Sequence, residues 1–169
     1  MARSEFQEAY DDPLTTRGEI FATPISDLSL REPITIDVAA TAADAVDAMN
    51  EHHTGCVLVG SSGRLVGIFT ERDVLTKVVF RHDGPLTPLE SVMTPNPETL
   101  EADATINYAL NMMSVGGYRH IPIVDRAHKP VGVLSVRDIV DFLVQLYPEE
   151  VLNLPPTPAK GIADSADGG

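Results

Sequence analysis

The apolar positions of the chain follow the same order twice. In two segments, apolar side chains recur every three or four residues. The first stripe is Ala42, Ala45, Val46 and Met49, and the second is Ile106, Ala109, Leu110 and Met113. This spacing is typical of an amphipathic helix with one face against a core. The run Thr41-Ala42-Ala43-Asp44 resembles a capping box with Asp in place of Glu, so we expect the first helix to begin there.

Short apolar runs beside turn residues predict the strands, and Ser61-Ser62-Gly63 predicts a tight turn between two of them. The strands span 33–36, 56–59 and 65–69 in the first copy, and 97–100, 118–124 and 131–134 in the second. Further helices are expected over 71–79 and 136–146. Each copy therefore reads β-α-β-β-α, and the fold class is mixed α/β (α+β) in two layers. Since a unit of about 60 residues buries only a marginal core, we expect two tandem repeats packed as a pseudo-two-fold pair.

The two copies keep a constant register. Pro33 recurs as Pro97, 64 positions later (97 − 33), and after one inserted turn residue Asp73 recurs as Asp138, 65 later (138 − 73). The expected organisation is an N-terminal arm over 1–23, a first repeat over 24–80, a linker over 81–88, a second repeat over 89–147 and a largely disordered tail over 148–169. Two packed copies enclose a cleft, and small molecules commonly bind in such clefts.

Charge and composition limit the kinds of partner that the protein can bind. With 25 acidic and 12 basic residues the formal charge is −13, which argues against nucleic acid and against anionic membranes, because both require a basic face. One cysteine excludes an internal disulfide. The acidic N-terminal residues do not resemble a signal peptide, and no apolar run reaches the length of a membrane span. We therefore expect a cytoplasmic protein.

Three sequence motifs carry a resemblance to a known family. Residues 67–73 (GIFTERD) and 132–138 (GVLSVRD) are in register, and residues 120–125 read HIPIVD. Over roughly residues 24–146 the chain resembles the CBS domain, named after cystathionine β-synthase. The resemblance implies a tandem pair that forms a homodimer, and a cleft that binds adenine nucleotides or related adenosyl ligands to regulate an attached or partner protein. It implies no obligatory cofactor.

The repeated turn from strand to helix is the main candidate site. Thr70 with Asp73, and Ser135 with Asp138, have the spacing of a capping box that needs no ligand. The same groups also suit a nucleotide, because a hydroxyl can donate to phosphate or ribose while an ionised Asp accepts from two vicinal hydroxyls. Arg72 and Arg137 precede each Asp and are either phosphate ligands or solvated surface residues.

The remaining candidates lie on the predicted strands. Thr35 and Thr99 line the cleft in the family, although Thr also favours strands without any ligand. Apolar contact with adenine would come from Cys56, Val57, Ile121 and Pro122, which are equally typical of core strands. Tyr118 could stack on a base, and Arg119 and His120 could contact phosphate. Because these three side chains belong to the second copy, we expect the cleft of Asp138 to bind a nucleotide more tightly than that of Asp73.

No catalytic or metal-binding set stands out. His52, His53, Cys56 and His120 match no closed zinc pattern, and Cys56 lies in an apolar run where a thiol is usually inert. The leading hypothesis is a sensor of AMP, ADP or ATP that changes conformation and acts on an unidentified effector protein. The alternatives are a ligand-independent dimeric assembly protein and, third, an enzyme such as a nucleotide hydrolase.

Overall fold

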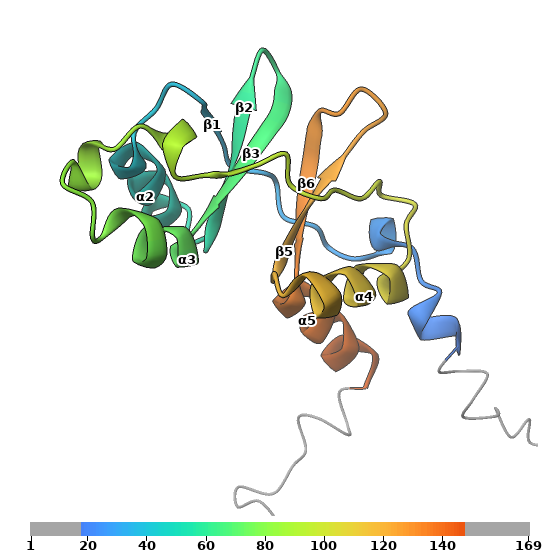
Figure 1. Ribbon diagram of the computed structural model, residues 1–169. Helices are drawn as coiled ribbons and strands as arrows, with labels where there is room; N and C mark the ends of the chain where they lie inside the picture. Colours follow the sequence, from blue (N-terminus) through green and yellow to red (C-terminus); the bar gives the residue numbers. More distant parts are fainter. Residues whose placement is uncertain (1–17, 148–169) are drawn as a thin grey trace, which may run out of the picture.

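The computed structural model describes residues 18–147 (Figure 1). The predictions for the disordered tail and for residues 1–17 of the arm lie outside the described residues. The chain forms two similar halves, each built on an antiparallel hairpin, and the two hairpins lie side by side (Figure 1). This is the predicted mixed α/β arrangement.

The first half contains a four-stranded sheet. Its elements are β1 (Thr35–Asp37), α2 (Ala42–Glu51), β2 (Cys56–Ser61) and β3 (Arg64–Thr70), followed by α3 (Glu71–Asp73) and the π-helix η2 (Val74–Val78). The fourth strand is β4 (Thr94–Pro95), and the strand order is β1-β2-β3-β4, with β1 parallel to β2 and the other pairs antiparallel. The predicted tight turn between β2 and β3 is confirmed by the positive φ angles of Ser62 (51°) and Gly63 (78°), which suit a two-residue hairpin loop.

The second half repeats the helices and the hairpin. It comprises α4 (Ile106–Gly116), β5 (His120–Val124), β6 (Pro130–Ser135) and α5 (Val136–Leu146). The predicted strand over 97–100 was wrong, because only Leu100 pairs, through one parallel bridge to Ile123. The buried faces of α2 and α4 are the predicted stripes: Ala42, Ala45 and Met49, then Ile106, Ala109 and Met113.

The first residues of each copy pack into the half formed mainly by the other copy. Ile25 of η1 (Ile25–Asp27) is fully buried in the core of the second half, against residues such as Ile106 and Ile121. Conversely, Leu89 of η4 (Leu89–Ser91) is buried in the core of the first half. Backbone hydrogen bonds follow the same pattern. β4, which follows η4, pairs with β3 of the first half, and Arg31, which follows η1, forms a bridge with Val133 of β6 in the second half.

The two crossing segments run in opposite directions between the halves, and both can be followed in Figure 1. We call residues 25–33 and 89–98 the first and second crossing segments. The predicted linker is not wholly irregular, since η3 (Gly84–Leu86) forms a 3₁₀ turn just before the second crossing segment. Each crossing segment has a buried residue in one half, Ile25 in the second and Leu89 in the first, and then continues into the other half. Separating the halves would therefore expose both cores.

Candidate functional site

The two turns predicted as candidate sites have nearly identical geometry. The backbone N–H of Thr70 and its hydroxyl both donate to Asp73 Oδ2, at 2.9 and 2.7 Å, and the N–H of Asp73 donates back to Thr70 Oγ1 at 3.3 Å. Ser135 and Asp138 form the same three bonds, at 2.7, 2.6 and 3.3 Å. The predicted capping boxes are therefore confirmed, and in each of them one carboxylate oxygen is committed to the cap.

The other oxygen of each aspartate faces a cation. Lys77 Nζ lies 2.7 Å from Asp73 Oδ1, and Arg31 Nε lies 3.4 Å from Asp138 Oδ1. Both carboxylates are more than nine-tenths buried, with side-chain exposures of 9% and 8%, whereas the two cations remain partly exposed. Lys77 is one helical turn from its partner, but Arg31 arrives on the first crossing segment. Neither cation could be predicted from the sequence, since the Arg31 pair depends on tertiary structure and the Lys77 pair on a helix register that many exposed lysines share.

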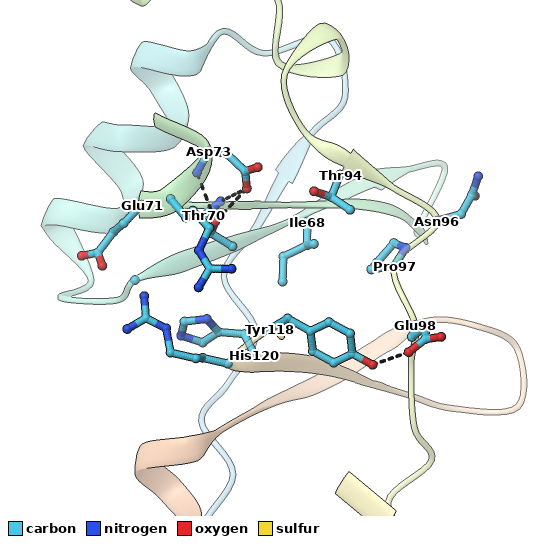
Figure 2. A pocket seen from close by; sticks show the side chains of 13 residues that line it. Ile68, Thr70, Glu71, Asp73, Thr94, Asn96, Pro97, Glu98, Tyr118 and His120 are labelled. Atoms are coloured by element: carbon cyan, nitrogen blue, oxygen red, sulfur yellow. Dashed lines mark hydrogen bonds between the residues drawn. The ribbon is translucent and has the colours of Figure 1, made fainter. Parts of the chain in front are cut away.

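Asp73 lies in a cleft of about 320 Å³ whose walls come from both halves. We call it the Asp73 cleft. The first half contributes Ile68 and residues 70–73, the second crossing segment contributes residues 94 and 96–98, and the second half contributes residues 118–120. Figure 2 shows Asp73 and Thr70 on one side of this cleft and Tyr118 and His120 facing them from the other. Its size is within the range of small-molecule sites.

Asp138 lies in a second cleft of about 500 Å³, the Asp138 cleft, with the roles of the halves exchanged. Ser135, Arg137 and Asp138 come from the second half and residues 52–56 from the first. Arg31, Glu32 and Ile34 come from the first crossing segment and the residue just after it. We call the residues that lead into β2 (52–56) and into β5 (118–120) the strand entries. Each cleft thus combines the hydroxyl–carboxylate turn of one half with the strand entry of the other.

The comparisons with known proteins agree with this architecture. The family model of the CBS domain matches residues 25–79 and 89–145. The chain belongs to the CBS domain family. It is 32% identical over 127 residues to an uncharacterized 17.7 kDa protein of Acidianus ambivalens, covering 75% of this chain and 76% of that protein.

Solved structures of CBS proteins share the fold. One is a CBS-domain containing protein from Agrobacterium tumefaciens, with a TM-score of 0.67, 25% identity and coverage of 72% of this chain and 99% of that one. Another is a CBS domain protein from Pyrobaculum aerophilum complexed with AMP, with a TM-score of 0.65, 25% identity and coverage of 73% and 99%. The predicted resemblance and the predicted tandem pair are therefore confirmed.

Tyr118 lies in the Asp73 cleft of this CBS pair, not in the Asp138 cleft where we expected it. That expectation was wrong because each strand entry faces the turn of the opposite half. The Tyr118 hydroxyl donates to Glu98 Oε2 (Figure 2). Burial and this carboxylate raise the pKa of Tyr118 to about 12, so the phenol keeps its proton at neutral pH. Gly116 leaves room for the ring, since a Cβ there would lie 2.0 Å from Tyr118 Cε1.

Arg119 and His120 line both clefts. Burial, followed by the charge of the neighbouring Arg119, lowers the pKa of His120 below its ordinary value of 6.5. His120 is therefore mostly uncharged at neutral pH. Cys56, which starts the equivalent strand of the first half, lines the Asp138 cleft, and burial raises the pKa of its thiol to about 11.

The other predicted site residues divide between clefts, core and surface. Arg72 lines the Asp73 cleft and donates from Nη1 to the Gly117 carbonyl at 3.0 Å, and Arg137 lines the Asp138 cleft with Nε 3.7 Å from Asp141 Oδ2. Five residues expected to line the nucleotide cleft lie outside both clefts: Thr35, Val57, Thr99, Ile121 and Pro122.

Four of these five corrections follow from burial or from position on the sheet. Val57 and Ile121 are buried in the helix-covered cores of the two halves, and Pro122 is buried at the next position of the same strand as Ile121. Thr35 lines a separate hollow beside the β2–β3 turn. Strand periodicity alone could not separate core-facing from cleft-facing positions.

Metal and membrane sites are not found in the described residues. No group of three or more His, Cys, Asp or Glu side chains within residues 18–147 could hold a metal ion. Within the same range, no helix is both long enough and apolar enough to cross a membrane.

Proposed function

We propose that this CBS pair is a regulatory module that binds an adenine nucleotide (AMP, ADP or ATP) or a related adenosyl ligand in its two clefts. One observation carries the proposal: each cleft places a buried aspartate, with one oxygen left over from its cap, opposite strand-entry residues of the other half. The similarity to the Pyrobaculum aerophilum protein complexed with AMP supports the same assignment.

The chemistry of the clefts suits a ribose phosphate. An ionised carboxylate only accepts hydrogen bonds, so the remaining oxygen of Asp73 or Asp138 can accept from the two vicinal hydroxyls of a ribose. Lys77 and Arg31 already hold these oxygens, and a ribose would share or displace the cation. Arginines suit phosphate because the guanidinium fork can bind two oxygens at once, and both clefts contain arginines.

A regulatory role is supported by the fact that residues of both halves line each cleft. A ligand held between the two halves favours the relative arrangement of the halves that it binds most tightly, and it can shift the equilibrium only by that difference in affinity. An effector protein that contacts both halves would sense this shift. We infer that the module acts on such a partner, and the cytoplasmic location stays a prediction.

We also propose a homodimer. Equivalent positions of the two halves expose apolar side chains: Leu75 is 66% exposed and Val140, 65 positions later (140 − 75), is 49% exposed. Phe80 beyond η2 and Val115 on α4 are also exposed, at 90% and 81%. Exposed apolar patches of this kind mark association sites. Sedimentation equilibrium should give twice the chain mass, and a monomer at high concentration would contradict the proposal.

The binding proposal is tested by thermal unfolding with AMP, ADP, ATP and adenosine. A ligand at 100 times its Kd stabilises the folded state by about 2.7 kcal/mol, which raises the melting temperature of a chain of this size by roughly 5–10 °C. Asp73→Asn and Asp138→Asn should each reduce the shift, and the double variant should abolish it. The matched control is Asp125→Asn, which changes a carboxylate outside both clefts. No shift with any of the ligands would contradict the proposal and favour the ligand-independent assembly protein.

We infer a binding rather than a catalytic role, because both cleft aspartates are engaged in caps and ion pairs. Chromatography of ATP incubated with the protein and Mg²⁺ should show no product, and ADP or AMP formation that is lost in the double variant would contradict the inference.

A further inference from the structure

The two clefts share one wall. Gly55, Glu71, Arg119 and His120 line both of them. Gly55 and Arg119 occupy equivalent places at the strand entries of the two halves, 64 positions apart (119 − 55). A symmetric pair would have either two arginines or two glycines in this wall, whereas this chain has one of each.

Arg119 is the one arginine of the clefts that has no partner among residues 18–147. The other three are held: Arg31 by Asp138, Arg72 by the Gly117 carbonyl and Arg137 by Asp141. Among residues 18–147, no carboxylate oxygen lies within 4.0 Å of the Arg119 guanidinium, and no acceptor forms a hydrogen bond with it. Its donors and its charge are therefore available to a ligand from either side.

The rest of the shared wall supplies no second cation. His120 is mostly uncharged at neutral pH because burial and Arg119 lower its pKa. Glu71 is an acid, so it repels phosphate. Gly55 has no side chain. An added Cβ there would lie 3.3 Å from Oε2 at the flexible end of Glu71 and 3.7 Å from His120 Cε1.

We propose that Arg119 is a specificity-determining residue shared by the two clefts, so that phosphorylated adenosyl ligands bind to them with negative cooperativity. The inference rests on the proposed function. The first ligand takes the guanidinium with its phosphate, and the second finds this donor occupied and a like charge nearby. A hydrogen bond to a charged group is worth enough to change affinity about tenfold or more. A ligand without phosphate does not compete for Arg119.

Isothermal titration calorimetry of the full chain with AMP and with adenosine tests this inference. AMP should bind in two steps whose intrinsic affinities are about tenfold further apart than those of the two adenosine steps, which reflect only the other differences between the clefts. Arg119→Gln should weaken the first AMP step about tenfold and reduce the separation of the AMP steps to that of adenosine. Arg119→Lys keeps the charge and is the matched control, so it should keep the separation between the steps.

A second variant adds the missing cation. Gly55→Arg places a guanidinium at the equivalent strand entry, and it should bring the second AMP affinity to within about threefold of the first. Gly55→Ala adds only the Cβ and should leave the separation unchanged. Circular dichroism and the melting temperature would confirm that each variant is folded before its titration is interpreted.

The results separate this inference from the proposed function. Two AMP steps of equal intrinsic affinity, or a separation that persists in Arg119→Gln, would overturn the shared role of Arg119 and leave nucleotide binding intact. A single site for both AMP and adenosine would also overturn it. If neither ligand binds, the proposed function itself fails.

Discussion

The two capping boxes of this CBS pair are alike in their backbone but differ in the cation that completes them. In the first half, Lys77 reaches Asp73 from one turn further along the same helical segment. In the second half, the equivalent position is Phe142, which packs on the core, and Asp138 is paired instead with Arg31. The comparison teaches that the motif determines the local geometry, while the tertiary partner is free to differ between copies.

The helices after the two boxes differ as well. After Asp73 the chain continues as the π-helix η2, whereas after Ser135 a regular α-helix runs to Leu146. A π-helical segment shifts side chains around the axis relative to an α-helix and often lies at a functional site. Here it accompanies the place where a lysine reaches back to the buried aspartate.

The largest expected effect breaks the exchange of crossing segments between the halves. Ile25→Ala removes a fully buried side chain from the core of the second half, and Leu89→Ala removes one from the core of the first. Each should cost about 3 kcal/mol of unfolding free energy, since large-to-small core changes cost 2–5. Urea unfolding measures the loss of unfolding free energy in each variant.

Hydrogen exchange shows which half is loosened. Ile25→Ala should speed exchange in α4 and β5 more than in α2 and β2, and Leu89→Ala should do the reverse. Leu86→Ala, at a position that is 75% exposed, is the control and should change neither. If Ile25→Ala instead loosened the first half, the crossing of the segments would be refuted.

The second prediction concerns Gly116, whose missing Cβ admits the Tyr118 ring to the Asp73 cleft. Gly116→Ala places a methyl group 2.0 Å from Tyr118 Cε1, so the ring must move, at a cost of about 1–3 kcal/mol. In a Tyr118→Thr background, which copies Thr54 of the first half, the same change should stabilise the helix by up to about 1 kcal/mol. Thermal unfolding of the four chains measures the reversal of sign, and destabilisation in both backgrounds would show that Tyr118 is not the obstacle.

Local features of the fold could be predicted from the sequence. The helical stripes, the turn at Ser62 and Gly63 and the capping boxes depend on residues close together in the chain. Each of these segments carries enough apolar or capping residues to specify its own conformation. The family could be predicted for the same reason, because its motifs combine such local features in a fixed order.

Features that depend on pairing between the halves could not be predicted. The first crossing segment has no apolar period, and nothing in its sequence directs Ile25 to the second core rather than the first. Tyr118 illustrates the same point, because it belongs to the same copy as Asp138 but lines the cleft of Asp73. A strand that is too short to show alternation, such as the one expected around Thr99, is equally hard to predict.

The third prediction sharpens the comparison of the two cations. Double-mutant cycles with Lys77→Met and Asp73→Asn, and with Arg31→Met and Asp138→Asn, measure each coupling free energy. Both pairs are partly exposed, so each coupling should be at most about 1 kcal/mol. The Lys77 pair should be the stronger, because its distance is 2.7 Å against 3.4 Å and its cation is less exposed. Couplings that do not fall in 0.5 M salt would show that the pairs are not electrostatic.

The smallest expected effect is a pH dependence that belongs to the second half alone. Burial lowers the pKa of His120 below 6.5 in the folded protein. The unfolded chain therefore binds more protons than the folded one as pH falls through 6.5, so His120 makes stability decrease from pH 7 toward pH 5. His120→Gln should flatten this part of the curve, whereas His82→Gln, at an exposed loop position, should not. Unfolding free energies between pH 5 and 7 check this, and an unchanged slope in His120→Gln would contradict it. Cys56, the equivalent residue of the first half, contributes nothing in this range because its thiol pKa is about 11.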